Sequence, residues 1–223
     1  MKTITIVIPA FNEGTRIVKT LQAVQEIAGI NKIIVVNDGS TDNTAEIVKE
    51  LNIDIINLKT NVGKGGAMNA SLSYIDTDIV VFLDADLGSS ANEAIKIIKP
   101  VAEGEADLCI AAFPPAQRKG GFGLVKGTAA KAIKRAGAME VNAPLSGQRA
   151  MTKEVLMAVT PFSQAYGVEL SMTITALRKG FRVIEVPTNM QHNETGRNLS
   201  GFIHRGKQFL DVLKVIIHEK RGK

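Results

Sequence analysis

The first half of the chain alternates short apolar segments with stretches whose apolar residues recur at helical spacing. Four apolar segments, rich in Ile and Val, favour buried strands at residues 4–8, 33–36, 53–58 and 79–83. Between them the periodicity predicts amphipathic helices, the first over residues 13–28. Strands that alternate with helices form parallel sheets, because each helix returns the chain to the edge where the next strand begins. We therefore predict an α/β fold, with helices on both faces of a single Rossmann-like, mostly parallel sheet.

Beyond residue 90 the alternation is less regular. The pattern predicts helices at residues 91–102, 124–136, 152–159, 166–179 and 202–218, and strands at 107–112 and 181–186. Residues 113–123 and 191–200 predict loops, and residues 144–149 predict a connector. No linker rich in Pro, Gly or Ser divides the chain, so we expect one domain over residues 1–223.

The composition narrows the classes of function. Of 223 residues, 45% are hydrophobic and 22% are charged, which is ordinary for a globular protein. The net charge of +5 suits anionic ligands, whereas the lack of Trp and the two Tyr argue against nucleic-acid binding. The single cysteine, Cys109, excludes an internal disulfide bond and a cysteine-based zinc site.

Nothing in the sequence predicts a transmembrane helix, since no segment stays apolar over the roughly 18 residues that one requires. Met1 and Lys2 lead directly into the first predicted strand, so we expect no signal peptide and a cytoplasmic location. The predicted helix at residues 202–218 is amphipathic, with basic residues beside its apolar side. Core packing or a homodimer contact explains this pattern, and peripheral binding to a membrane surface is the alternative.

Two carboxylates end the fourth predicted strand. Asp84 and Asp86 are separated by one residue, and in extended backbone such positions point to the same side. Open α/β sheets bind ligands at this carboxyl edge. Neighbouring carboxylates repel unless a cation lies beside them, and Mg²⁺ or Mn²⁺ shared with a diphosphate meets that need. The alternative is a strand-ending turn in which an aspartate caps the next helix.

Two further loops follow strands at the same predicted edge. Lys64 lies among glycines at a helix start, where backbone N–H groups favour a phosphate. Its spacing matches neither a P-loop nor a Rossmann fingerprint, and a plain loop-to-helix junction is the alternative. Asp38 ends a buried strand and needs a partner there, for which a base or a ribose is a candidate. Asp42 or Thr41 is expected to cap the following helix.

Two residues of the second half are candidates for chemistry. His192 lies in a polar loop and could complete a cation site at Asp84 and Asp86, although a lone histidine is more often a surface residue. Glu169 lies in the first turn of a predicted helix, where the helix dipole alone favours a carboxylate. A general base or a substrate-positioning group is the alternative for Glu169.

Taken in order, the motifs of the first half resemble those of family 2 glycosyltransferases of GT-A fold. The motifs are Pro9-Ala10-Phe11-Asn12-Glu13, Val36-Asn37-Asp38-Gly39-Ser40-Thr41-Asp42, Asn61-Val62-Gly63-Lys64-Gly65 and Asp84-Ala85-Asp86. The resemblance implies a divalent metal and a nucleotide-sugar donor, held by residues 1–90. It places the donor at Pro9, Phe11, Glu13, Asp38, Ser40, Lys64, Asp84, Ala85 and Asp86.

The second half is similar to the glucosyl-3-phosphoglycerate synthase branch, with dolichol-phosphate mannosyltransferases as neighbouring relatives. The similarity lies in Pro144-Leu145-Ser146-Gly147-Gln148-Arg149-Ala150, Pro161-Phe162, Tyr166-Gly167-Val168-Glu169 and Gln191-His192. It implies that His192 joins Asp86 as a metal ligand and that residues 91–200 hold the acceptor. The expected acceptor site consists of Leu145, Ser146, Gly147, Tyr166, Glu169 and Arg197, together with Arg118 and Lys119, which are chosen for the positive charge of their segment. The chain departs from that branch at Phe122, where the branch has an arginine that reads the acceptor phosphate.

The sequence therefore predicts a metal-dependent glycosyltransferase with Asp84, Glu169 and Lys64 as catalytic residues. We expect a UDP-sugar donor, with glucose as the first choice, and an acceptor bearing phosphate or carboxylate, such as phosphoglycerate. A polyprenyl phosphate at the membrane surface is the alternative acceptor. From another class, the alternative is a non-catalytic nucleotide-sugar-binding protein. A nucleotidyltransferase would need a Gly-x-Gly-Thr-Arg-like loop, which residues 9–13 lack.

Overall fold

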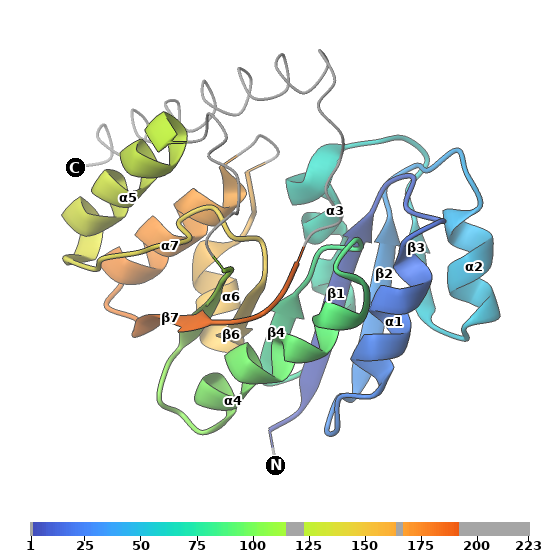
Figure 1. Ribbon diagram of the computed structural model, residues 1–223, viewed down its shortest axis with the longest axis horizontal. Coiled ribbons are helices and arrows are strands. Elements are labelled where there is room, and N and C mark those ends of the chain that lie inside the picture. The colour runs from blue at the N-terminus through green and yellow to red at the C-terminus, as the bar shows by residue number, and fades with distance from the viewer. Residues whose placement is uncertain (1, 115–122, 164–166, 192–223) are drawn as a thin grey trace.

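A seven-stranded sheet runs through the computed structural model, which describes residues 2–114, 123–163 and 167–191 (Figure 1). The strand order is β3-β2-β1-β4-β6-β5-β7, and β6 alone runs antiparallel to its two neighbours. The strands are β1 Ile4–Ala10, β2 Lys32–Asn37, β3 Asp54–Asn57, β4 Ile79–Phe82, β5 Leu108–Ala112, β6 Arg149–Thr152 and β7 Val183–Pro187. The prediction of an α/β fold with a mostly parallel sheet is confirmed.

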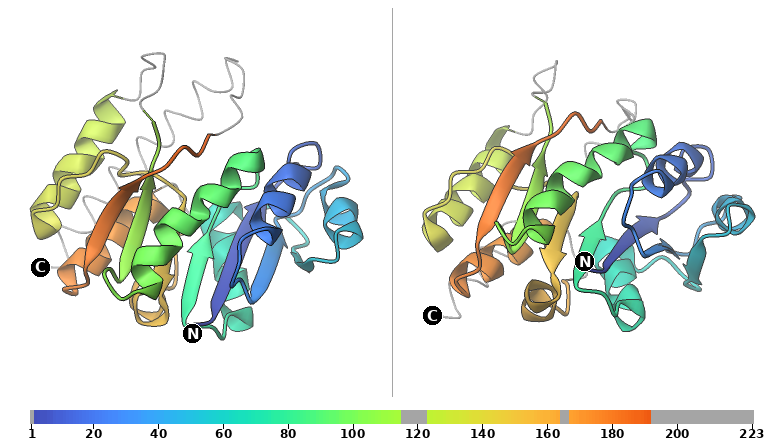
Figure 2. Two further views of the ribbon diagram at one scale, coloured as in Figure 1. Left: turned by 60° about the horizontal axis from the view of Figure 1, so that its bottom comes forward. Right: turned by 90° about the horizontal axis from the view of Figure 1, so that it is seen from below.

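Helices lie on both faces of this sheet, as the alternation predicted (Figure 2). They are α1 Ile17–Gln25, α2 Thr44–Glu50, α3 Gly63–Ser71, α4 Ile95–Ala102, α5 Gly123–Gly137, α6 Lys153–Val159 and α7 Val168–Arg178, with 3₁₀ turns at Leu72–Tyr74 and Gly88–Ala94. No helix in the described part of the chain is long and apolar enough to span a membrane.

Alternating residues of β1 show how the two faces are filled. Ile6 and Ile8 are fully buried against one cluster, which also contains the apolar sides of α1 and α4. Val7 points the other way, into a second cluster that includes residues of α3, α6 and α7. A third, smaller cluster joins Ile133 of α5 to Ile174 of α7, so α5 packs outside α7. Successive residues of β1 point to opposite faces of the sheet, so the position of a residue in the strand decides which layer of helices it packs against.

Strand β6 was not predicted. Residues 144–149 were expected to form a connector, and Thr152 was expected to begin a helix. Instead, Arg149 begins β6 opposite Phe82 of β4, and Thr152 ends it while capping α6 by accepting a hydrogen bond from the Val155 N–H at 3.3 Å. Because β6 is antiparallel, its first residue lies at the carboxyl edge of β4. The residues just before Arg149 therefore reach the edge where Asp84 lies.

Several predicted boundaries also shift. Residues 13–28 contain only α1, since the chain from Glu13 enters it through a turn in which the Glu13 carbonyl accepts from Arg16 and Ile17 N–H groups. Residues 91–102 begin as a 3₁₀ turn and become α-helical at Ile95. The predicted helix at residues 202–218 lies outside the described residues.

Candidate active site

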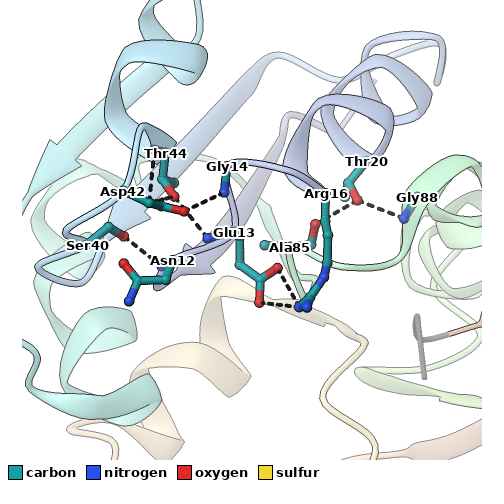
Figure 3. Close-up of polar contacts among 10 residues, drawn as sticks. All are labelled: Asn12, Glu13, Gly14, Arg16, Thr20, Ser40, Asp42, Thr44, Ala85 and Gly88. Carbon is teal, nitrogen blue, oxygen red and sulfur yellow. Dashed lines mark hydrogen bonds and ion pairs between the residues drawn. The ribbon is translucent and has the colours of Figure 1, made fainter. Parts of the chain in front are cut away.

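Hydrogen bonds tie the loops after β1 and β2 together at the carboxyl edge (Figure 3). The backbone N–H of Asn12 donates to Ser40 Oγ at 2.9 Å, and that of Gly14 donates to Asp42 Oδ2 at 3.0 Å. Asp42 also accepts from the Thr44 N–H at 3.1 Å. The N-cap of α2 is Asn43, which makes no side-chain cap bond, so the cap expected from Asp42 or Thr41 is not formed. Burial acts to raise the pKa of Asp42, but these hydrogen bonds, with that of the Thr44 hydroxyl, lower it below its ordinary value. Asp42 is therefore a structural carboxylate.

The loop after β4 is fixed to α1 by one buried hydroxyl. Thr20 Oγ1 donates to the Ala85 carbonyl at 2.8 Å and accepts from the Gly88 N–H at 2.8 Å (Figure 3). The strand ends at Phe82, and Ala85 and Asp86 form a turn. Asp84 and Asp86 therefore lie beyond the end of β4, with Asp86 in a turn, so the strand itself does not align them. The two side chains are placed by their own contacts.

Asp84 lies between a lysine and a glutamine. Its Oδ1 is 2.6 Å from Lys64 Nζ, and its Oδ2 accepts from Gln148 Nε2 at 2.7 Å. The Asp84 backbone N–H donates to Gln148 Oε1 at 3.1 Å. The cation that the carboxylate pair was expected to need is therefore partly supplied by the protein itself, as Lys64.

Lys64 also joins Asp84 to Glu169, whose Oε1 lies 3.1 Å from Nζ. Burial acts to lower the pKa of Lys64, but the two carboxylate charges, Asp84 first, raise it above its ordinary value. Lys64 is therefore a fixed positive charge near neutral pH. Gly147 is packed so close that a Cβ atom there would clash with Lys64 Nζ and touch both oxygens of Asp84. The structure thus brings all three predicted catalytic residues into one cluster.

Asp38 finds its partner inside the chain. The N–H groups of Val62 and Gly63 donate to its two oxygens at 2.8 and 3.0 Å, so Asp38 anchors the start of α3. Burial raises its pKa above the ordinary value, against the effect of these two bonds. The partner that burial of Asp38 was expected to require is supplied by these backbone donors, and its contact with a base or a ribose stays a prediction. Phe11 and Val62 are large apolar side chains that remain exposed at this edge, by 44% and 42%.

The carboxylate charges of Glu13 and Asp86 influence each other. Burial raises the pKa of Glu13, and the charge of Asp86 raises it further, while Arg16, 3.2 Å from Glu13, opposes both effects. Within the described residues no group of three His, Cys, Asp or Glu side chains could hold a metal. His192, the predicted additional ligand, lies outside the described residues. The carboxylate oxygens of Asp86 suit a hard cation that takes its other ligands from a diphosphate and water.

The predicted acceptor site is described only in part. Leu145 is half-buried, Ser146 and Gly147 are buried, and all three precede β6 beside Asp84. Among described side chains, Ser146 Oγ is a buried oxygen with no hydrogen-bond partner. The other predicted residues, which lie outside the described part, are Arg118, Lys119, Tyr166 and Arg197.

Sequence reasoning gave Gln148 no role. It belongs to the motif Pro144 to Ala150, yet its two bonds to Asp84 connect residues that are 64 positions apart. No local pattern announces such a contact. Pro9 and Ser40, predicted donor residues, do lie at the ends of β1 and β2, and Ala85 is buried below the Asp86 turn.

Comparisons with known proteins agree with this architecture. The family model described as "Glycosyl transferase family 2" matches residues 5–156. Glycosyltransferase AglJ of Haloferax volcanii is 26% identical over 218 residues, which cover 95% of this chain and 71% of that protein. Glucosyl-3-phosphoglycerate synthase of Mycobacterium tuberculosis is 29% identical over 197 residues, covering 78% of this chain and 60% of that protein.

A crystal structure of that synthase with Mg²⁺ and UDP shares the fold. The TM-score is 0.81 at 24% identity, over 97% of this chain and 79% of the other. This likeness in fold identifies the architecture as GT-A-like. With the family model matching most of its length, the chain belongs to glycosyltransferase family 2 and is a glycosyltransferase of GT-A-like fold.

Proposed function

We propose that this glycosyltransferase moves a sugar, glucose as first choice, from a UDP-sugar to an acceptor bearing phosphate or carboxylate. The observation that carries the proposal is the position of Lys64 between Asp84 and Glu169. One cation there connects the glycine-rich loop, the end of β4 and the first turn of α7. A lysine held protonated at this junction can offset the negative charge that develops on a leaving diphosphate.

The donor proposal rests on the loops at the ends of β1, β2 and β4. Phe11 and Val62 offer exposed apolar surface for a base, and Pro9, Glu13, Asp38, Ser40 and Ala85 lie on the same three loops or strand ends. The synthase of Mycobacterium tuberculosis has been crystallised with UDP-glucose, which makes UDP-glucose the first donor to test.

We assign a bound Mg²⁺ or Mn²⁺ to Asp86, with His192 as a further ligand. Gln191, which precedes His192, donates its N–H to Ser90 Oγ at 3.0 Å, and Ser90 lies in the 3₁₀ turn just after Asp86. The chain therefore returns to the Asp86 loop immediately before the histidine. A divalent ion at this position supplies positive charge for the diphosphate. Asp86 holds it through a carboxylate oxygen, as hard cations prefer.

The acceptor is assigned to the side of the cluster formed by Leu145, Ser146, Gly147 and Glu169. Arg118, Lys119, Tyr166 and Arg197 complete the proposed set. The segment from Ala116 to Gly137 contains basic residues and no acidic one, which favours an anionic acceptor. Glu169, 3.1 Å from Lys64, lies between this side and the donor loops and is assigned to the sugar or the acceptor hydroxyl.

A polyprenyl phosphate is the second candidate acceptor, and Phe122 favours it. A phenylalanine within a basic segment adds apolar surface next to cationic side chains, which suits a lipid phosphate better than phosphoglycerate. The amphipathic pattern of residues 202–218 agrees with an enzyme that works at a membrane surface.

The proposal is tested in two steps. A thermal-shift panel of UDP-, GDP- and dTDP-sugars, with and without Mn²⁺, identifies the donor, because a ligand that binds only the folded state raises the melting temperature. Radiolabelled UDP-glucose is then supplied with 3-phosphoglycerate, with a short polyprenyl phosphate, or with a neutral sugar. A larger shift with GDP-sugars than with UDP-sugars would overturn the donor, and transfer only to the neutral sugar would overturn the acceptor.

A further inference from the structure

We propose that Gln148 is a positioning residue for glycosyl transfer, which orients Asp84 so that Lys64 is held between Asp84 and Glu169. The inference rests on the proposed function only in its use of UDP-sugars as probes. Gln148 is expected to contact neither donor nor acceptor, and to act through Asp84.

Gln148 holds Asp84 by both ends of its amide. Its Oε1 accepts from the Asp84 backbone N–H at 3.1 Å, and its Nε2 donates to Asp84 Oδ2 at 2.7 Å. Gln148 is fully buried, whereas the Asp84 side chain is 25% exposed. A hydrogen bond from a buried amide to a carboxylate is charge-assisted and geometrically selective. One residue thus fixes both the backbone and the side chain of Asp84.

This arrangement decides which oxygen meets Lys64. Because Oδ2 is bonded to Gln148, Oδ1 faces Lys64 Nζ at 2.6 Å. The chain at Gly147 passes close to Nζ, and a Cβ atom added there would force Lys64 to shift. If the amide were removed, the Asp84 side chain could rotate about its Cα–Cβ bond and the position of Lys64 would no longer be set.

Gln148 is itself held in place by its neighbour. Arg149 is fully buried, and its Nε donates to the Ser146 carbonyl at 2.8 Å while its Nη1 donates to Thr173 Oγ1 at 2.8 Å. Thr173 Oγ1 in turn donates to the Glu169 carbonyl at 2.9 Å. Arg149 therefore connects the segment before β6 to the turn of α7 that presents Glu169, and Gln148 lies inside that connection.

A glutamine that only stabilises the fold would also be buried, so the variants must distinguish a role in stability from a role in positioning Asp84. Gln148→Met is close in size and removes both bonds to Asp84. The control is Asn69→Leu, because Asn69 also holds one residue through both ends of its amide, donating to the Phe162 carbonyl at 2.8 Å and accepting from its N–H at 2.7 Å. Both substitutions lose a two-bond amide contact, but only the first faces the Lys64 cluster.

We expect Gln148→Met to lower kcat/KM for the UDP-sugar about 10- to 100-fold, the usual cost of losing a group that orients a ligand-binding residue. KM for the donor should rise, whereas Asn69→Leu should lower the melting temperature and leave KM unchanged. A loss of folded protein lowers the apparent kcat and cannot raise KM. Gln148→Glu keeps an acceptor for the Asp84 N–H but sets a second carboxylate against Asp84 Oδ2, so it should be at least as damaging as Gln148→Met. Wild-type KM and kcat in Gln148→Met would overturn the proposal.

A second measurement needs no donor. In a double-mutant cycle, the loss of melting temperature caused by Gln148→Met should be smaller in an Asp84→Ala background, because the Oδ2 bond is already gone. Additive losses would show that the two side chains are not coupled and would overturn the inference. If the wild-type protein binds no UDP-sugar, the proposed donor is wrong. The double-mutant cycle still reports on the contact between Gln148 and Asp84 in that case. The kinetic comparison is then made with the donor that the thermal-shift panel identifies.

Discussion

The ammonium of Lys64 lies 2.6 Å from Oδ1 of Asp84, so the first helix turn after the glycine-rich loop is joined to the end of β4. Glu169 holds the same ammonium from α7 at 3.1 Å. Lys64 is thus shared by the elements assigned to the donor and the element assigned to the acceptor. A diphosphate that binds here must compete with two carboxylates for one cation, and this makes the charge balance of the cluster sensitive to single substitutions.

Replacing Lys64 should affect activity far more than folding. We expect Lys64→Met to lower kcat about 100- to 1,000-fold, the typical cost of removing one group that stabilises developing charge. Steady-state kinetics with the donor from the panel measures the loss, and circular dichroism checks the fold. Lys49→Met, at an exposed position on α2, is the matched control and should behave as wild type. Equal kinetics in the two variants would remove Lys64 from the catalytic set.

Asp86→Ala should weaken Mn²⁺ binding in the presence of UDP while the protein stays folded. Calorimetric titration of Mn²⁺ into the protein with UDP gives the affinity. Asp42→Ala serves as the control, because Asp42 holds the chain before α2 through Gly14 and Thr44 and should cost melting temperature without changing the metal affinity. An unchanged affinity in Asp86→Ala would contradict the metal assignment.

His192 is tested separately, since only its place in the sequence supports it as a ligand. His192→Ala should lower the Mn²⁺ affinity measured with UDP at pH 7.5, a pH chosen about one unit above the ordinary histidine pKa of roughly 6.5, where imidazole is neutral and can coordinate. His204→Ala, another histidine of the C-terminal region, should leave it unchanged. The assignment would be wrong if both variants titrated like wild type.

The acid side of stability should depend on Asp107. Hydrogen bonds from Arg182, first from its side chain, lower the pKa of Asp107 below its ordinary value of 3.8, despite the opposing effect of burial. A folded-state pKa below the unfolded one gives stability that is present above pH 3.8 and is lost as the pH falls through the folded pKa. Melting temperatures are measured from about pH 7 down to about pH 2.5, in steps of roughly one pH unit. As the pH falls, the melting temperature should drop more steeply for wild type than for Asp107→Asn. Parallel curves would show that this pair does not couple to folding.

The sequence was enough for those parts of the fold that depend on local pattern. The strands and helices up to β4 follow from two kinds of periodicity, each of which is visible within a few residues. The helix cap expected from Asp42 or Thr41 does not follow in this way, because the N-cap of α2 is Asn43 and Asp42 joins Gly14 and Thr44 instead. Resemblance then placed Lys64, Asp84 and Glu169 in one site, and their contacts bring them together.

What the sequence could not supply depends on distant contacts. Strand β6, with the sequence Arg-Ala-Met-Thr, has no β-branched apolar run like that of β4, and it is a strand because β4 and β5 flank it. The bonds of Gln148 to Asp84 exist only once β6 is in place. The start of α3 likewise uses both oxygens of Asp38, which sequence reasoning had reserved for a ligand. Polar side chains near a strand end therefore cannot be divided into structural and ligand-binding groups before their backbone partners are known.

The anionic acceptor is tested by removing charge from one side of the cluster. Arg118→Ala/Lys119→Ala should raise KM for the acceptor about 10-fold or more, because a hydrogen bond between charged groups contributes about 1.5–3 kcal/mol, while KM for the donor should not change. Lys131→Ala/Lys134→Ala is the matched control, since it removes the same charge from the exposed side of α5. If Arg118 and Lys119 bind the phosphate or carboxylate of the acceptor, their replacement should leave transfer to a neutral sugar unaffected. The ratio of transfer to the anionic acceptor over transfer to the neutral sugar should then fall. Equal loss in both double variants would mean that net charge, and not a built site, attracts the acceptor.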